Sequence, residues 1–233
     1  MDKKYCTAIV LAAGSGKRMG TKVHKQYLLM GGRPVLYYSL KAFQDSELID
    51  EIILVTGSGE EKYCREHIVE PYGITKVKKI VTGGAERYHS VWNGLQETED
   101  GYVFIHDGAR PFVNEDIINR AYECVCSCGA CVAGMPSKDT VKIADSSQIV
   151  SETPDRNHVW IVQTPLVFDT SIVKKAYAML MERGETGVTD DAMVVEMMSG
   201  NPIQLFHGSY ENIKITTPED LEIAEVFLRR TEG

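Results

Sequence analysis

The feature that most constrains the fold is the stretch at residues 8–27. It begins with an apolar run at residues 8–13, which is typical of a buried strand. The run ends in Gly14-Ser15-Gly16, where backbone N–H groups can approach an anion because the glycines carry no Cβ. The strand and its turn therefore predict an anion-binding loop.

Four cations follow this turn within a dozen residues, namely Lys17, Arg18, Lys22 and Lys25. The whole chain has a net charge of −8, so this local cluster stands out against its background. The simplest ligand that the turn and the cations predict is a polyphosphate. The alternative is a solvated loop with incidental lysines.

The loop matches neither of two common phosphate-binding motifs. The dinucleotide motif G-x-G-x-x-G needs Gly or Ala at its sixth position, where this chain has Met19. The Walker A motif needs Gly where the chain has Leu11, and Ser or Thr where it has Arg18. What remains is A-A-G-S-G-K-R-M followed by K-Q-Y, which resembles the signature of nucleotidyltransferases that join a sugar or polyol phosphate to an NTP.

Length and composition restrict the class of protein. The 233 residues are ample for one α/β domain, spanning residues 1–233, with a single core. The negative net charge argues against a general nucleic-acid binder, and no run approaches the ~20 apolar residues of a membrane span. The first residues lead directly into the first strand without a signal peptide, so we expect a cytoplasmic enzyme with neither nucleic acid nor membrane as partner.

Strands and helices alternate along the chain, which predicts a Rossmann-like, mainly parallel twisted sheet with helices on both faces. The expected strands lie at residues 8–13, 51–56, 77–82, 102–105, 129–135, 159–162, 203–206 and 212–216. The expected helices lie at residues 34–43, 59–69, 114–126, 171–183 and 192–198, with two more beginning near residues 86 and 218.

Two further strand ends supply candidate ligand contacts. Gly83 and Gly84 open into a helix from which Ser90 could reach a ligand, although Ser90 could instead be a helix cap. The strand at 102–105 delivers Asp107 and Arg110 to the edge where open α/β sheets bind ligands.

Asp107 could orient Mg²⁺, its waters or a substrate hydroxyl, and Arg110 could hold a phosphate. A purely structural pair between the two is the alternative. We expect the neighbouring His106 to pack against the sheet rather than to act in catalysis.

Four cysteines are bunched at Cys124, Cys126, Cys128 and Cys131, which raises the question of a zinc site. Residues 124–128 look helical and Cys131 begins a strand, so we expect the thiols to splay apart and to be ordinary buried side chains. Disulfides are not expected in a chain without an export signal.

Residues 138–143 and 148–152 look like two short strands with no helix to bury them on the main sheet. An isolated hairpin of this size is marginally stable. We therefore expect an arm at approximately residues 137–158 that projects, embraces a second subunit and makes the protein a homodimer.

Several blocks occur in one order from about residue 7 to about residue 225: A-A-G-S-G-K-R-M, K-Q-Y, G-G-A-E-R, H-D-G-A-R-P, K-D-T-V-K, D-R, Q-T-P, T-D-D-A and N-I-K-I-T-T-P-E-D-L. In that order they closely resemble the 2-C-methyl-D-erythritol 4-phosphate cytidylyltransferases of the non-mevalonate isoprenoid pathway. The resemblance implies that CTP and methylerythritol phosphate give CDP-methylerythritol and pyrophosphate. It also implies Mg²⁺, held mainly by the CTP phosphates, with Asp107 as a candidate ligand.

The resemblance further implies roles for particular residues. Arg18 and Lys25 stand where the family stabilises the transition state, and Arg156 and Lys214 stand where it positions the acceptor phosphate. The other substrate-side positions are Asp107, Arg110, Thr140 and Thr164. The nucleotide-side positions are Ala12, Ala13, Gly14, Ser15, Gly16, Gly83, Gly84 and Ser90. The family exchanges its arms between subunits, so Thr140 and Arg156 would complete the site of the other chain.

Two residues depart from the family pattern. His24 replaces the usual proline before K-Q-Y, and we expect it to loosen the loop that aims Lys25. Leu166 replaces the usual glutamine after T-P and cannot make that residue's polar contacts.

The chemistry of this reaction agrees with the residues present. A phosphate nucleophile is already ionised, so the protein needs no strong base and no covalent intermediate. It must bring two anions together in line and neutralise the charge that develops, which calls for Arg, Lys and Mg²⁺.

The sequence leaves three alternatives open. Ribitol 5-phosphate cytidylyltransferase has similar loops and a similar acceptor, although the K-D-T-V-K block favours methylerythritol phosphate. A catalytically inactive nucleotide-binding protein is disfavoured because the four key cations are all present. A nicotinamide-dependent reductase is disfavoured by Met19 and by the lack of an acid for the ribose after the second strand.

Overall fold

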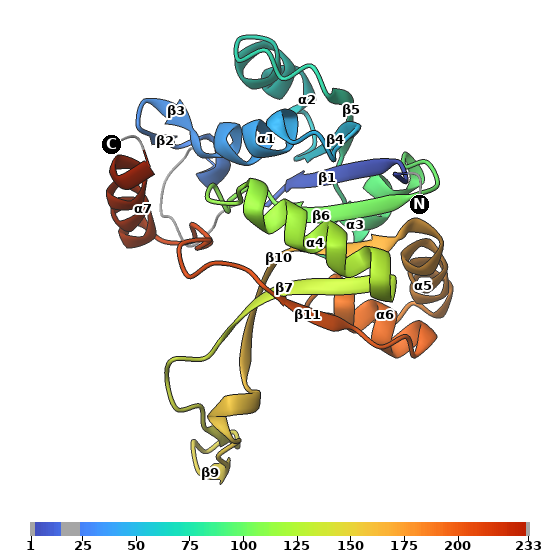
Figure 1. Ribbon diagram of the computed structural model, residues 1–233, viewed down its shortest axis with the longest axis vertical. Coiled ribbons are helices and arrows are strands. Elements are labelled where there is room, and N and C mark those ends of the chain that lie inside the picture. Colours follow the sequence, from blue (N-terminus) through green and yellow to red (C-terminus); the bar gives the residue numbers. More distant parts are fainter. Residues whose placement is uncertain (1–2, 15–23, 232–233) are drawn as a thin grey trace.

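The structure, a computed structural model, describes residues 3–14 and 24–231 of the chain. Its centre is a seven-stranded sheet with helices on both faces (Figure 1). The strands of this sheet are β1 (Cys6–Ala12), β4 (Glu51–Thr56), β5 (Val77–Thr82), β6 (Tyr102–Asp107), β7 (Ala130–Pro136), β10 (Trp160–Asp169) and β11 (Gln204–His207). Their order is β11-β7-β10-β6-β1-β4-β5, and β10 alone runs antiparallel to its neighbours β6 and β7. The predicted mainly parallel α/β sheet is confirmed.

Helices and short elements complete the described chain. The helices are α1 (Val35–Asp45), α2 (Glu61–Cys64), α3 (Arg87–Gln96), α4 (Glu115–Cys128), α5 (Thr170–Arg183), α6 (Asp191–Ser199) and α7 (Pro218–Thr231). The short elements are the 3-10 turns η2 (Lys25–Tyr27) and η4 (Arg156–His158), the π-turn η3 (Arg65–Val69), and the strand pairs β2 (Leu29–Met30) with β3 (Arg33–Pro34) and β8 (Ile143–Ala144) with β9 (Val150–Glu152). Within the described ranges, no helix is both long enough and apolar enough to cross a bilayer.

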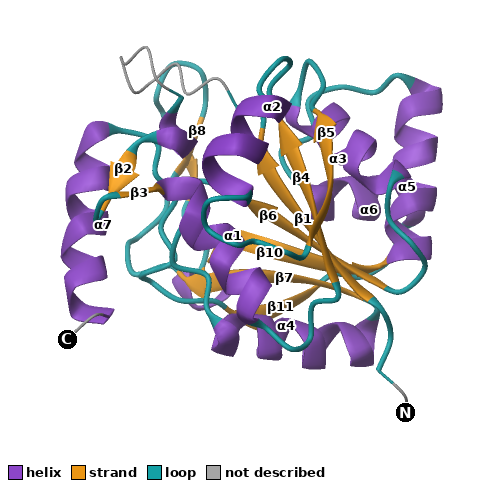
Figure 2. Ribbon diagram, turned by 90° about the horizontal axis from the view of Figure 1, so that it is seen from above, coloured by secondary structure: helices purple, strands orange, loops and turns teal. Residues whose placement is uncertain are grey.

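The sheet separates two hydrophobic cores, one on each face. Helices α1, α2 and α4 pack on one face and α3, α5 and α6 on the other (Figure 2). The alternation of strand side chains explains the split, since Ala8 and Val10 of β1 enter the first core while Ile9 enters the second. Because the central strands are buried on both faces, they read as continuous apolar runs in the sequence.

A third, smaller core lies under α7 and helps to place the site. It joins Ala224 and Leu228 of α7 to Met30, Val35 and Ile215, all buried. The Ile215 backbone N–H also donates to the Ala109 carbonyl at 2.8 Å. The packing of α7 thus fixes the segment that carries Lys214 next to the end of β6.

Two strands predicted for the main sheet require correction. The strand expected at 159–162 continues as β10 to Asp169 through a cis Thr164–Pro165 bond, because a shift in register between Val162 and Leu166 accommodates the proline. The strand expected at 212–216 is wrong. That segment forms no ladder. The N–H groups of Asn212, Ile213 and Ile215 instead donate to loop carbonyls, and that of Thr216 donates to the Asp220 carboxylate.

The expectation that the clustered cysteines splay apart is also wrong for three of them. The sulfur atoms of Cys124, Cys128 and Cys131 lie within 4.8 Å of one another. Cys124 and Cys128 share a helix face, because residues four apart on a helix are neighbours. Gly129 then reverses the chain and brings Cys131 back beneath them.

The segment between β7 and β10 projects from the body of the molecule (Figure 1). It contains β8, β9 and η4, and nearly all of its side chains are exposed. We keep the name "arm" for residues 137–158. Its place in the chain makes it an extension of two adjacent strands of the main sheet.

Candidate active site

A cavity of about 400 Å³ opens at the carboxyl edge of the sheet, where the sequence predicts a ligand. Its volume falls within the range of small-molecule sites. The ends of β1 and β6, the glycine loop before α3, the turn η2 and the segment before α7 all contribute to its wall. The lining residues are Leu11, Ala12, Ala13, Gly14, Lys25, Gln26, Gly84, Ala85, Glu86, Arg87, Ser90, Asp107, Ala109 and Lys214.

Asp107, the last residue of β6, is the electrostatic centre of this wall. Lys214 Nζ lies 2.7 Å from its Oδ2, Arg87 Nε lies 3.5 Å from its Oδ1, and Arg110 Nε lies 3.8 Å from its Oδ2. Burial alone would raise the pKa of Asp107, but these three cations outweigh burial and hold that pKa well below its usual range. The carboxylate is therefore charged at neutral pH and orients the cations around it.

Arg87 and Asp191 form a second ion pair that the sequence analysis missed. Both terminal nitrogens of Arg87 donate to the Asp191 carboxylate at 2.8 Å, and the fully buried Asp191 also accepts from Tyr177. Burial alone would lower the pKa of Arg87, but Asp191 and then Asp107 raise it instead. The sequence T-D-D-A contains a signal for this pair. A helix start needs one capping acid, and Asp190 fills that role by accepting from the Met193 N–H. The second acid, Asp191, is therefore available for another partner.

His106 and Thr164 lie beneath the cavity wall rather than in it. Thr164 Oγ1 accepts from the Asp107 N–H at 3.2 Å and donates to His106 Nδ1 at 2.9 Å, while His106 Nε2 donates to the Arg110 carbonyl at 3.1 Å. Burial lowers the pKa of His106 to about 4, which is consistent with a neutral ring. His106 is packed as predicted. The hydroxyl of Thr164 is occupied in the wall, and Thr164 does not line the cavity.

The glycine loop packs closely against the end of β1. A Cβ on Gly83 would lie 2.5 Å from the Ala13 Cβ and 2.8 Å from Ser90 Oγ, so a side chain there would push the two loops apart. Ser90 Oγ accepts from the Gly84 N–H at 3.0 Å and donates to the Glu86 carbonyl at 3.3 Å. Ser90 therefore braces the loop while it also lines the cavity.

Lys25 lines the cavity from η2, and its neighbour holds the turn in place. Gln26 is buried and donates from Nε2 to the Ala12 carbonyl at 2.6 Å. This bond ties the turn to the end of β1. Lys25 thereby faces the same space as Gly14.

The two departures from the family pattern have different surroundings. His24 Nδ1 lies 2.6 Å from Glu60 Oε1, and its ring stacks on Tyr27, whose hydroxyl donates to Glu60 Oε2 at 2.8 Å. His24 is thus close to Glu60, although its Nδ1 makes no hydrogen bond with the described residues. The residues before His24 lie outside the described ranges, so the expected loosening of the loop stays a prediction. Leu166 is a core residue of β10 with 1% of its surface exposed.

The remaining predicted residues lie elsewhere. Arg18, Ser15 and Gly16 fall outside the described residues. Arg110 donates to the Asn212 carbonyl at 2.8 Å and stays behind Asp107, as in the structural alternative. Thr140 and Arg156 are exposed on the arm and do not line the cavity of their own chain.

The family model of 2-C-methyl-D-erythritol 4-phosphate cytidylyltransferase matches residues 6–230. The chain belongs to this family. The resemblance found in the ordered blocks is thereby confirmed over almost the whole length.

Individual relatives agree with the family match. The chain is 53% identical over 225 residues to the 2-C-methyl-D-erythritol 4-phosphate cytidylyltransferase of Lachnospira eligens, which covers 96% of this chain and 99% of the relative. The structure resembles the crystal structure of 4-diphosphocytidyl-2C-methyl-D-erythritol synthase from Anaerococcus prevotii, with a TM-score of 0.85, 35% identity and 97% of each chain covered. For the cytidylyltransferase of Thermus thermophilus the TM-score is 0.77 at 30% identity, covering 95% of this chain and 98% of that one. These similarities confirm the family's fold here.

Proposed function

We propose that the chain transfers the cytidylyl group of CTP to 2-C-methyl-D-erythritol 4-phosphate, giving CDP-methylerythritol and pyrophosphate. One observation carries this proposal. The chain belongs to the family, and its cavity at the sheet edge is lined by Lys25, Lys214 and a glycine loop. Relatives that share about half of its residues are named for this reaction. The family match therefore does not favour ribitol 5-phosphate as the acceptor.

The reaction needs positioning and charge neutralisation rather than proton removal. An oxygen of the acceptor phosphate attacks the α-phosphorus of CTP, and the new P–O bond forms as the bond to the β-phosphate breaks. Pyrophosphate leaves with the electron pair of that bond, so atoms and charge balance without a base. Negative charge develops on the equatorial oxygens, where Lys25, and Arg18 by family position, would neutralise it.

Lys214 is the residue that would meet the acceptor phosphate. Its ammonium is held at 2.7 Å by Asp107, and 36% of its side chain is exposed. The buried Asp107 and the Arg87–Asp191 pair behind it set the position of this cation before a ligand arrives. Asp107 and Asp191 are thus positioning residues in this proposal.

The site fits Mg²⁺ when the nucleotide supplies most of the ligands. Two acids line the cavity, Glu86 and Asp107, and Asp107 is already surrounded by cations. This is too little for an all-protein cage, but Mg²⁺ commonly binds one carboxylate together with substrate phosphates. The ion would add positive charge beside the phosphates, and Asp107 would be its ligand from the chain.

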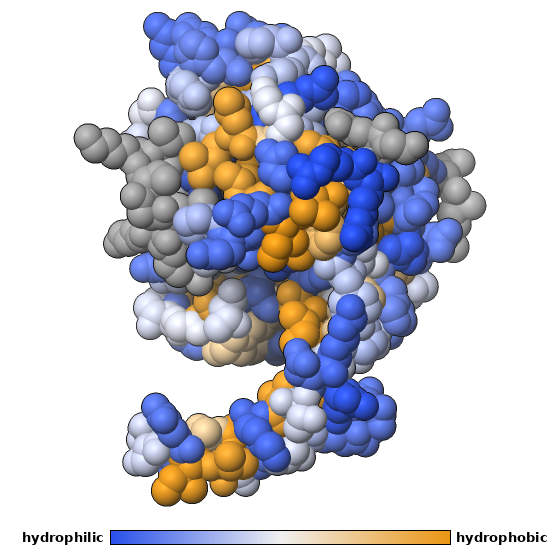
Figure 3. All heavy atoms as spheres, turned by 90° about the vertical axis from the view of Figure 1, so that its left-hand side faces the viewer, coloured by the Kyte–Doolittle hydropathy of each residue, from blue (hydrophilic) through white to orange (hydrophobic). Residues whose placement is uncertain are grey.

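A homodimer is the second part of the proposal. Thr140 and Arg156 lie on the arm, away from their own cavity, although their family positions contact substrate. Apolar side chains are exposed along the arm and its root (Figure 3), namely Ile143, Ile149, Val150, Ile161 and Val162. An exposed apolar patch of this kind is typical of a protein interface. Exchange of arms would cover it and would bring Arg156 to the cavity of the second subunit.

The test is pyrophosphate release from CTP and Mg²⁺, with methylerythritol phosphate and ribitol 5-phosphate compared in parallel. Release with methylerythritol phosphate is expected, and Lys25→Ala should slow it about a hundredfold, which is about 3 kcal/mol. The matched control is Lys41→Ala, since Lys41 is a surface lysine paired with Asp45 on α1.

Three outcomes would contradict the proposal. Release with ribitol 5-phosphate alone would overturn the acceptor, and CTP binding without turnover would favour an inactive nucleotide-binding protein. If Lys25→Ala unfolded instead of being folded and inactive, the assigned role of Lys25 would be wrong.

A further inference from the structure

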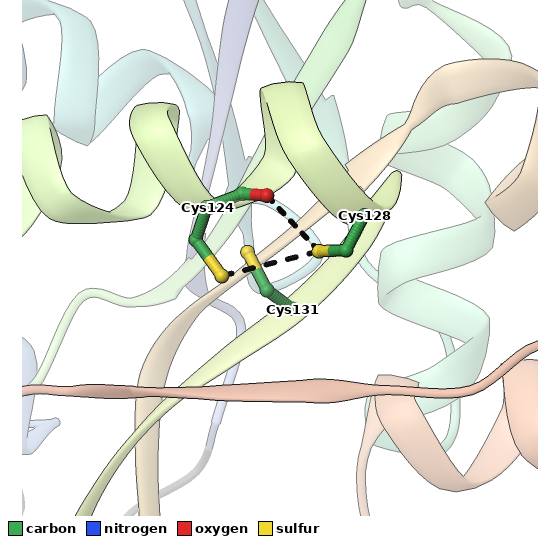
Figure 4. Close-up of side chains that lie close together, drawn as sticks. All are labelled: Cys124, Cys128 and Cys131. Carbon is green, nitrogen blue, oxygen red and sulfur yellow. Dashed lines mark hydrogen bonds between the residues drawn. The ribbon is translucent and has the colours of Figure 1, made fainter.

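The thiols at the end of α4 have no part in the proposed reaction. Cys124 and Cys128 lie one turn apart on α4, and Cys131 is the second residue of β7. The Cys124 and Cys128 sulfurs are 3.9 Å apart, and all three sulfurs lie within 4.8 Å of one another (Figure 4). Side chains from a helix and a strand therefore face one shared space.

The backbone that brings them together is well defined. Gly129 ends α4 in the left-handed conformation, with φ of 76°, and its N–H donates to the Val125 carbonyl at 2.9 Å. Glycine adopts this conformation without the cost that a Cβ imposes. The chain thus turns directly from the last helical turn into β7, so the thiols are held by two regular elements.

The spacing suits a metal ion bound by three thiolates. With Zn–S bonds of about 2.3 Å, ligand sulfurs lie about 3.8 Å apart in a tetrahedral site and about 4.0 Å apart in a trigonal one. The 3.9 Å between Cys124 and Cys128 already matches, and the limit of 4.8 Å leaves less than an ångström to close. A disulfide, with its S–S bond of about 2.05 Å, would use two of the sulfurs and leave the third unused.

The three thiols differ in burial, so an ion could reach the group from solvent through the exposed one. Cys131 is fully buried, Cys124 is half-buried and Cys128 is exposed. Their present hydrogen bonds are weak, since Cys128 donates to the Cys124 carbonyl at 3.0 Å and Cys131 to the Ala121 carbonyl at 3.6 Å. Metal binding would release these thiol protons to solvent and replace the weak bonds with metal–sulfur bonds.

We propose that Cys124, Cys128 and Cys131 form a three-thiolate site for a thiophilic d¹⁰ cation, Zn²⁺ or Cu⁺. Thiolates select such ions over Mg²⁺, so the site would not compete for the ion of the reaction. No fourth His, Cys, Asp or Glu of the described residues joins the three. Water would complete a tetrahedral zinc shell, whereas Cu⁺ needs no fourth ligand.

The proposed site is remote from the cavity. Strands β6 and β7 both run antiparallel to β10 and are therefore parallel to each other. Asp107 ends β6, whereas Cys131 is the second residue of β7, so the two sites lie at opposite ends of these parallel strands. Metal bound there would join α4 to β7 and stabilise the fold by mass action without entering the reaction.

The test uses the full chain, reduced and freed of metal. Zn²⁺ is titrated against a chromophoric chelator, Cu⁺ against a Cu⁺-selective chelator under nitrogen, and Co²⁺ is followed by its sulfur charge-transfer absorption. We expect one equivalent of Zn²⁺ or Cu⁺, and the absorption that marks thiolate ligands on Co²⁺.

Variants locate the ion. Cys128→Ser, at an exposed position, and Cys124→Ser should lose this binding, whereas Cys126→Ser should keep it, since Cys126 is exposed on the same helix but is not one of the three. Each variant should retain the thermal unfolding temperature of the metal-free chain and its pyrophosphate release. These readouts separate a failure of this proposal from a failure of the proposed function.

Three results would overturn the proposal. The first is absence of binding in the reduced chain, and the second is binding that persists in both serine variants. The third is formation of a disulfide within the trio in air by a chain that binds no metal when reduced.

Discussion

The charged cluster at Asp107 and the arm differ in how their charged side chains are paired within the chain. In the cluster, Asp107 is buried among cations of its own chain, and Arg87 is held by Asp191 behind it. On the arm, Arg156 is exposed and donates to the Lys138 carbonyl at a long 3.4 Å. The charges of the first region find partners within one chain, whereas we propose that the second region finds them in a second subunit. Damage to the first should cost stability as well as activity, and damage to the second should cost activity alone.

The strongest test of this contrast is Asp107→Asn. The substitution leaves Lys214, Arg87 and Arg110 without their shared buried countercharge, so the free energy of unfolding should fall by about 3–5 kcal/mol. Urea unfolding measures the change. Asp155→Asn is the matched control on the arm, where the side chain is exposed, and should change it by at most about 0.5 kcal/mol. Equal losses in the two variants would contradict the contrast.

Arg156→Ala tests the arm, the second region of the comparison. Turnover should fall about a hundredfold, because the proposed exchange of arms makes Arg156 a cation that positions the anionic substrate. The free energy of unfolding should stay within about 0.5 kcal/mol of the parent, because Arg156 is exposed. Arg183→Ala, at an exposed arginine on α5, is the control and should leave both quantities unchanged. If Arg156→Ala kept full turnover, Arg156 of the arm would have no role in the active site.

The pH dependence of stability should also separate the regions. Buried His106 has its pKa lowered from 6.5 to about 4, so the unfolded chain takes up a proton at a higher pH than the folded chain. Stability should therefore fall by about 2.5 kcal/mol as the pH drops from 6.5 to 4. The contribution of Asp107, whose pKa is lowered, is present above its ordinary value of 3.8 and is lost at still lower pH.

Unfolding followed by circular dichroism at several pH values measures this slope. His106→Gln should flatten it between pH 6.5 and 4. His158→Gln, at an exposed histidine of the arm, should leave it unchanged. A slope that survives His106→Gln would show that other groups produce it.

The smallest expected effect concerns the departure at position 24. His24→Ala removes one partly exposed contact to Glu60 and should cost about 0.5 kcal/mol of stability. Glu60→Ala should cost more, because Glu60 also accepts from Tyr27 and from the Gly57 N–H. Thermal unfolding of both variants checks the order. The reverse order would mean that His24 does more than contact Glu60.

Local patterns predict much of the fold and part of the site. The central strands are continuous apolar runs, and Asp107, Lys25 and the glycine loops follow them at strand or loop ends that the topology gathers at one edge. Lys214 was found only through its family position, since its segment reads as a strand but is a loop held under α7.

What the sequence hides depends on contacts between distant elements. Arg87 and Asp191 are 104 residues apart, and an acid at a helix start reads first as a cap. The strand β10 continues through Pro165 because a bulge absorbs the proline, whereas a proline in a sequence usually marks a strand end. The cysteines meet because Gly129 takes the left-handed turn, a conformation that residue identities suggest but do not fix.

The insertion of the arm between β7 and β10 has a genetic consequence. If the arms exchange, each active site combines the cavity of one chain with Arg156 of the other. In a cell with two alleles, the two halves of a site can therefore come from different alleles. A dimer of one Lys25→Ala chain and one Arg156→Ala chain would hold one doubly defective site and one intact site. Two inactive alleles of this gene would then complement each other in a single cell.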